Sequence, residues 1–128
     1  MQKFEIKESI KIPRILIDFE RGIINLIGRS TLEKPDEFYP KVIDVINLYI
    51  NNPHQTTKVL VDLEYYNTKS AEYLFLILNR IDSLHKENKS EVKIFWHYDP
   101  DDYGIIGDIN NLKTTLQSNV YAIEYELA

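Results

Sequence analysis

The sequence has no cysteine among its 128 residues, which excludes disulfide bonds, thiolate metal sites and cysteine nucleophiles. It also lacks any apolar run close to the roughly 20 residues that a membrane-spanning helix requires. The first residues mix charged and apolar side chains and contain no apolar segment of the kind found in signal peptides. We therefore expect a cytoplasmic protein that does not insert into a membrane.

The chain also lacks the sequence patterns that bind nucleic acid, phosphate or metal ions. Its net charge is −5 and its acidic residues are scattered, which argues against a basic surface for nucleic acid. Three histidines are present (His54, His85 and His97), and no two have the spacing of metal ligands. The sequence contains neither a glycine-rich phosphate loop nor a Gly-x-Ser-x-Gly elbow. We expect no nucleic acid, metal or cofactor, and no enzymatic activity.

Hydrophobic periodicity predicts a single α/β domain over residues 1–128, with the element order β-β-α-β-α-β-α-β. The expected strands are residues 14–19, 23–27, 58–65, 92–98 and 120–125; the expected helices begin near Pro35, Lys69 and Tyr103. Gly22 supplies the turn of an antiparallel hairpin, and Gly28 is expected to end its second strand. Helical crossovers give parallel neighbours, so the sheet is predicted to be mixed. Residues 1–11 are either an edge strand or an extended arm.

The chain is organised around residues 59–70, where an apolar strand runs into Asn67-Thr68-Lys69-Ser70 and a helical pattern begins at once. Ligands and modifications tend to be found at such a corner, because it lies at the carboxyl end of a strand. Asn67 or Thr68 suits the helix N-cap. The Thr68 hydroxyl also suits a phosphoacceptor, with Ser70 as the second candidate, because the amides of the first helical turn favour a phosphate.

Two further groups of side chains are candidates for function. Trp96-His97-Tyr98-Asp99 ends a strand predicted to be parallel to residues 58–65, so it should emerge at the same edge as Thr68. His97 beside Asp99 suggests a general base, although a buried tryptophan with a turn-forming aspartate explains the same residues. Tyr65 and Tyr66 point to opposite faces of their strand, so one is expected in the core and the other near the surface.

The residues Leu63 to Ser70, followed by Trp96-His97-Tyr98-Asp99, resemble the SiaC family of bacterial regulatory phosphoproteins. The resemblance covers most of the chain and depends on the two motifs together. It implies a fold similar to STAS domains, the fold of anti-sigma-factor antagonists, as a mixed sheet with helices packed mainly on one face. Lys69 departs from the pattern, because a small polar residue is expected there.

The resemblance also implies a function. In this family a cognate serine/threonine kinase phosphorylates the threonine of Asn-Thr-x-Ser, and a PP2C-type phosphatase removes the phosphate. In the type case of the family, the unphosphorylated form binds and activates a diguanylate cyclase, which promotes cyclic-di-GMP synthesis and biofilm formation. Carried over to this sequence, the phosphoacceptor is Thr68, and the expected partner-binding residues are Tyr65, Tyr66, Asn67, Lys69, His97, Tyr98 and Asp99.

Three hypotheses of function are therefore open. The first is a non-enzymatic signalling switch controlled by phosphorylation of Thr68. The second is a small-molecule or nucleotide-binding domain that uses the same sheet edge, with His97, Asp99 and Asn67 as the polar groups of its pocket. The third is a small hydrolase that uses His97 and Asp99, for which the sequence supplies no partnered nucleophile.

Overall fold

The computed structural model describes residues 2–126 and contains a six-stranded sheet and three helices. In chain order the elements are β1 (Lys3–Ile6), β2 (Arg14–Asp18), β3 (Ile23–Ser30), α1 (Pro35–Asn51), β4 (Thr56–Tyr66), α2 (Thr68–Lys86), β5 (Glu91–Tyr98), α3 (Tyr103–Thr115) and β6 (Asn119–Glu124). The strands lie in the sheet in the order of the sequence. The predicted order of elements is confirmed, with β1 added at its start.

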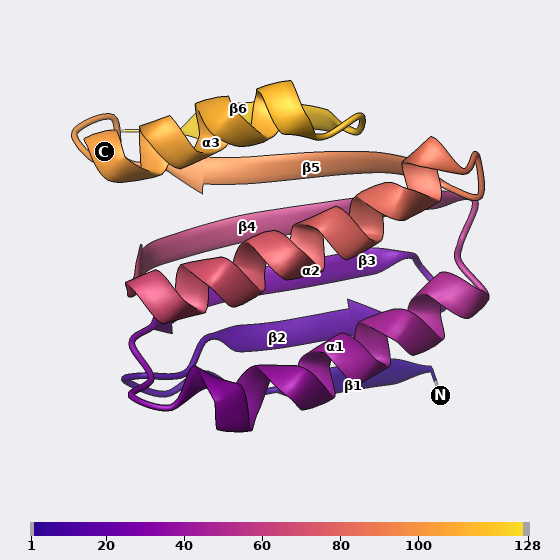
Figure 1. Ribbon diagram of the computed structural model, residues 1–128, viewed down its shortest axis with the longest axis horizontal. Helices are drawn as coiled ribbons and strands as arrows, with labels where there is room; N and C mark the ends of the chain where they lie inside the picture. Colours follow the sequence, from indigo (N-terminus) through magenta and orange to yellow (C-terminus); the bar gives the residue numbers. More distant parts are fainter. Residues whose placement is uncertain (1, 127–128) are drawn as a thin grey trace.

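The sheet is mixed, as predicted. β1, β2 and β3 pair antiparallel, whereas β3, β4, β5 and β6 pair in parallel through the helical crossovers. All three helices lie on one face of the sheet (Figure 1). The opposite face is not covered by a helix, so the predicted packing of helices mainly on one face is confirmed.

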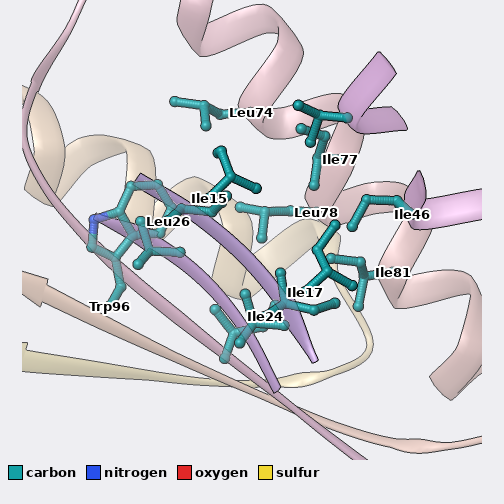
Figure 2. Close-up of a cluster of buried hydrophobic side chains, with 14 of the residues drawn as sticks. Ile15, Ile17, Ile24, Leu26, Ile46, Leu74, Ile77, Leu78, Ile81 and Trp96 are labelled. Atoms are coloured by element: carbon teal, nitrogen blue, oxygen red, sulfur yellow. The ribbon is translucent and has the colours of Figure 1, made fainter. Parts of the chain in front are cut away.

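The core lies between the sheet and the helices because strand residues alternate between the two faces. In β4, Val59, Val61 and Leu63 are buried under the helices, while Leu60 and Asp62 between them are half-buried on the opposite face. The buried side of α2 repeats every three or four residues (Leu74, Ile77, Leu78 and Ile81) and meets side chains of β2, β3 and β5, as Figure 2 shows. Because β4 lies between β3 and β5, the prediction that it is central is confirmed.

The structure decides between the two alternatives left open for the N-terminal segment and corrects one prediction at the end of the hairpin. The N-terminal segment is a strand and not a free arm, since β1 pairs antiparallel with β2. β3 does not end at Gly28 but continues to Ser30, with an irregularity in its pairing with β4 between Gly28 and Arg29. Gly28 has a φ of +115°, which a side chain would resist, so this glycine permits a bulge where it was expected to stop the strand. The bulge places Ser30 opposite Tyr66.

Candidate functional site

The corner between β4 and α2 is built around Asn67, which is the N-cap residue of α2. Its Oδ1 accepts a hydrogen bond from the backbone N–H of Ser70 at 2.9 Å, and its Nδ2 donates to the carbonyl of Leu32 at 2.8 Å. Its own N–H donates to the carbonyl of Ser30 at 3.0 Å. Of the two cap candidates, Asn67 makes the cap, so the Thr68 hydroxyl is not used for capping.

Thr68 is the first residue of α2, and its side chain is exposed. It lies at the positive end of a 19-residue helix whose first turn has no acidic residue. A negatively charged group on its hydroxyl would meet the free amides of that turn and would displace no core side chain. Thr68 is therefore exposed at the corner between a strand and a helix, which is where the sequence predicted it.

Ser70 lies in a different environment, and the structure contradicts it as a second phosphoacceptor. Its side chain is fully buried, and its Oγ accepts a hydrogen bond from Ser30 Oγ at 2.8 Å. Ser30 Oγ is also hydrogen-bonded to the phenol oxygen of Tyr39 at 2.6 Å. Burial raises the pKa of the Tyr39 phenol, which stays protonated in this network. Ser70 thus joins α2 to β3 and α1, and a kinase has no access to it in this conformation.

Lys69 belongs to an exposed cluster that joins the starts of α1 and α2. Its Nζ lies 3.5 Å from Asp36 Oδ2, and the phenol of Tyr73 donates a hydrogen bond to the same carboxylate. The ring of Tyr73 stacks on that of Tyr39, with centroids 5.2 Å apart. The Tyr73 hydrogen bond and the charge of Lys69 lower the pKa of Asp36, so this carboxylate remains ionised at neutral pH.

A groove of about 480 Å³ lies beside Thr68, between the start of α2 and the start of α3. One wall comes from the end of β4 and the first turns of α2, and the other from α3 and its N-cap. The lining residues are Tyr65, Tyr66, Asn67, Thr68, Ala71, Glu72, Phe75, Asp102, Gly104, Ile105 and Asp108. The groove thus places Thr68 on the wall of a concave and partly apolar surface.

Tyr65 and Tyr66 have the opposite orientations that their alternation predicted. Tyr65 is 51% exposed at the groove, whereas Tyr66 is half-buried with its ring 6.4 Å from that of Trp96. The Tyr66 phenol donates a 2.6 Å hydrogen bond to Asp108 Oδ2 of α3. Burial and this carboxylate raise the pKa of Tyr66, so its phenol remains a donor and holds α3 against the end of β4.

The second motif lies at the same edge of the sheet, as expected, but it does not line the groove. Trp96 is fully buried on the helix-covered face, so His97 points to the opposite face by alternation. The Tyr98 phenol donates to Glu124 of β6 at 3.3 Å, and Asp99 Oδ1 accepts from the N–H of Asp101 at 2.9 Å in the turn before α3. His97, Tyr98 and Asp99 do not line the groove beside Thr68, and their part in partner binding stays a prediction.

These positions weaken the two catalytic and ligand-binding alternatives. Of the polar groups expected in a small-molecule pocket, only Asn67 lines the groove, and His97 and Asp99 do not. Within residues 2–126, no group of three or more histidine, aspartate or glutamate side chains is placed to hold a metal ion. In the same part of the chain, no helix is long and apolar enough to cross a membrane.

The far wall of the groove is the part of the site that sequence reasoning missed. It is formed by Asp102, Gly104, Ile105 and Asp108, which follow Thr68 by more than thirty positions in the sequence. The sequence did contain one sign of this wall, which is the pair of glycines, Gly104 and Gly107, in the first turns of α3. Gly104 has no side chain at the groove, and this leaves room between α2 and α3.

Comparison with known proteins agrees with the family resemblance found in the sequence. The chain matches the family described as SiaC family regulatory phosphoprotein over residues 6–125. It is 26% identical over 99 residues to an uncharacterized protein of Pseudomonas aeruginosa strain UCBPP-PA14, covering 77% of this chain and 78% of that protein.

Solved structures from Pseudomonas aeruginosa have the same fold. The chain is similar to SiaC in a crystal structure of the diguanylate cyclase SiaD in complex with its activator SiaC, with a TM-score of 0.85 and 20% identity over 95% of this chain and 99% of that chain. It is similar to apo-SiaC with a TM-score of 0.84 and 21% identity over 96% and 99% of the two chains. At these identities the structures establish the fold of this chain alone.

Proposed function

The chain belongs to the SiaC family of regulatory phosphoproteins, and from this premise we propose that it is a non-enzymatic signalling switch whose phosphoacceptor is Thr68. In the unphosphorylated form it binds and regulates an output protein, and phosphorylation prevents that binding. A serine/threonine kinase adds the phosphate and a PP2C-type phosphatase removes it. Since SiaC of Pseudomonas aeruginosa is named as the activator of the diguanylate cyclase SiaD, we propose a diguanylate cyclase as the output protein, and cyclic-di-GMP and biofilm control as the outcome.

The observation that carries this proposal is that Asn67 caps α2, which leaves the hydroxyl of Thr68 free of a capping role. Asn67 caps α2, while Thr68 exposes its hydroxyl at the start of the same helix. A phosphate there brings about −1.5 to −2 charges and is favoured by the helix dipole. Lys69 adds a neighbouring cation, because its exposed pair with Asp36 is weak enough to exchange for the phosphate. Phosphorylation would therefore alter the surface while leaving the fold intact.

The groove explains how a phosphate at this point would control binding. Thr68 is on the groove wall next to Ala71 and Phe75, so a partner that fills the groove would have to strip water from the phosphate. Desolvation of a buried ion costs several kcal/mol, whereas an exposed ion pair returns about 0.2–1 kcal/mol. The net effect is exclusion, and a difference of about 3 kcal/mol changes affinity roughly 150-fold.

The experiment is a pull-down from the native host with Thr68→Val and Thr68→Asp baits, analysed by mass spectrometry. We expect the valine bait to retain an output protein that the aspartate bait loses. Thr114→Asp, which places the same charge on an exposed position of α3 outside the groove, is the matched control and should retain the partner. Equal recovery of every partner by the valine and aspartate baits would contradict control by charge at Thr68.

A small-molecule ligand is the second candidate, favoured by a groove volume of about 480 Å³ that falls in the range of ligand pockets. A nucleotide fits poorly, because three carboxylates line the groove and no lysine, arginine or histidine does so within the described residues. Thermal-shift measurements with nucleotides and with cationic metabolites test this candidate. A rise in melting temperature that disappears in a groove variant would support it.

A further inference from the structure

The floor of the groove is apolar. Ala71 and Phe75 of α2 and Ile105 of α3 line it, with Ile105 only 6% exposed, and Tyr65 beside them is 51% exposed. Aromatic rings that are rigid and partly exposed next to a concave apolar surface are typical anchors of protein interfaces. The floor therefore suits an apolar side chain supplied by another molecule.

The rim of the groove is acidic. Glu72, Asp102 and Asp108 line it, and no basic side chain within the described residues does so. Asp102 Oδ1 accepts from the N–H of Ile105 at 3.0 Å, and Asp108 Oδ2 accepts from the phenol of Tyr66. Each of these aspartates thus has a second oxygen available to a cation. Glu72 is exposed four residues after Thr68, which puts both side chains on the same side of α2.

We propose that this groove is the docking site for a segment of the output protein that presents an apolar side chain flanked by lysine or arginine. The apolar side chain enters between Phe75 and Ile105, and the cations pair with the acidic rim. Charge complementarity selects this occupant, because an acidic segment would meet like charge and a purely apolar one would leave the carboxylates facing an apolar surface. The identity of the segment's owner rests on the proposed function, whereas the chemistry of the groove does not.

This occupant accounts for the position of Thr68. A cation paired with Glu72 would lie one helical turn from the Thr68 hydroxyl, and the apolar side chain would lie against Ala71 beside it. The regulatory hydroxyl is thus on the wall that the docked segment covers. A phosphate there would be buried against the apolar side chain of the docked segment, and this loss of hydration opposes binding by more than the cations at the exposed rim favour it.

The test uses short synthetic peptides of equal length and the full chain. The first peptide alternates leucine and lysine on one face, the second replaces lysine with glutamate, and the third replaces leucine with glutamine. We expect only the leucine–lysine peptide to bind, and we expect its amide chemical-shift changes in NMR spectra to centre on Ala71, Glu72 and Gly104. Binding should weaken as salt is raised. Equal binding of all three peptides, no binding, or shifts centred on another surface would overturn the proposal.

Two triple variants distinguish the effect of the groove carboxylates on binding from the effect of the protein's net charge. Glu72→Gln with Asp102→Asn and Asp108→Asn removes the acidic rim, while asparagine preserves the cap of α3 and an acceptor for Tyr66. Glu8→Gln with Glu20→Gln and Asp44→Asn removes three exposed carboxylates elsewhere, and both variants change the net charge from −5 to −2. We expect the groove variant to bind the leucine–lysine peptide about tenfold more weakly. The control variant should bind like the wild type, and equal losses in both variants would overturn the proposal.

Failure of this inference and failure of the proposed function are distinguishable. The peptides are bound by the unmodified protein, so their binding does not depend on whether the host phosphorylates Thr68. Groove-specific binding together with partners that ignore Thr68 variants would retain the docking site and reject the switch. Partner loss on Thr68→Asp without peptide binding would retain the switch and reject the docking chemistry.

Discussion

At the scale of single residues, the two hydroxyls of Asn67-Thr68-Lys69-Ser70 lie on opposite sides of α2. An α-helix turns by about 100° per residue, so side chains two positions apart point in nearly opposite directions. Thr68 consequently faces solvent, while Ser70 faces Ser30 and Tyr39 in the interior. One motif thus contains an exposed hydroxyl, for which we propose regulation, and a buried hydroxyl that belongs to the core.

Replacing each residue with alanine, which removes its hydroxyl, tests this division. Ser70→Ala leaves the buried Ser30 hydroxyl without its acceptor and should lower the free energy of unfolding by about 1–3 kcal/mol. Thr68→Ala, at an exposed position, should change it by no more than about 0.5 kcal/mol. Urea unfolding measures both. Equal destabilisation by the two variants would show that the two hydroxyls are in similar environments.

Asn67 provides a second residue-scale prediction. Asn67→Ala removes the acceptor for the Ser70 N–H and should destabilise the protein by about 1 kcal/mol, measured by urea unfolding. Asn67→Asp keeps that acceptor at the cap but puts a carboxylate oxygen in place of the amide that donates to the Leu32 carbonyl, so it should recover only part of the loss. If alanine and aspartate behave alike, the cap oxygen is not what stabilises this corner.

At the scale of elements, α3 contains two glycines, Gly104 and Gly107, that have different surroundings. A Cβ built at Gly107 meets nothing within 4 Å, whereas one at Gly104 lies 3.5 Å from Asp102 Oδ1. Both glycines weaken the helix relative to alanine. Of the two glycines, only Gly104 lines the groove. We therefore expect a side chain at position 104 to affect both the stability of α3 and binding in the groove, and one at position 107 to affect stability alone.

Alanine at each position should reveal this difference. Gly107→Ala should raise the free energy of unfolding by about 0.5–1 kcal/mol without affecting partner binding. Gly104→Ala should stabilise by a similar amount and weaken partner binding, because its methyl group enters the groove. Chemical denaturation and binding assays on the same two proteins check the prediction. A loss of binding with Gly107→Ala would show that rigidity of α3, and not space in the groove, controls docking.

At the scale of the whole molecule, tyrosines link the helices and strands at both ends of the sheet. The phenol pKa is raised for Tyr39, Tyr66, Tyr73, Tyr98 and Tyr125, five of the nine tyrosines in the sequence. Burial is the main cause for all of them except Tyr73, whose hydrogen bond to Asp36 comes first. The folded protein therefore retains phenol protons that the unfolded chain releases near pH 10.

The sign of the resulting pH dependence follows from linkage. Below about pH 10 both states hold these protons and the stability is at its full value; above it the folded state holds more protons than the unfolded state, so stability falls as pH rises. Urea unfolding at increasing alkaline pH should show this decline, and unfolding should add the tyrosinate absorbance of these five residues. Tyr66→Phe should reduce the slope, and Tyr103→Phe, at a ring that is 80% exposed, is the matched control. A free energy of unfolding that is independent of pH in this range would contradict the raised pKa of these phenols.

The sequence by itself determined the order of the elements, the central place of β4 and the helix start at Asn67-Thr68. These features depend on short-range signals: apolar periodicity, turn glycines and a capping side chain act within a few residues of one another. The same locality led to one error, since Gly28 was expected to end a strand that continues past the bulge. It also left open whether residues 1–11 form an edge strand or an extended arm, and the structure has the edge strand β1 there.

Only the tertiary structure decided which side chains share a surface. It buried Ser70, pointed His97 to the uncovered face of the sheet and brought Asp102 and Asp108 of α3 opposite Thr68. The physical reason is that these relations depend on strand register and helix packing between segments distant in the chain. Local patterns place each residue on its own element, but the packing of elements determines what that residue meets.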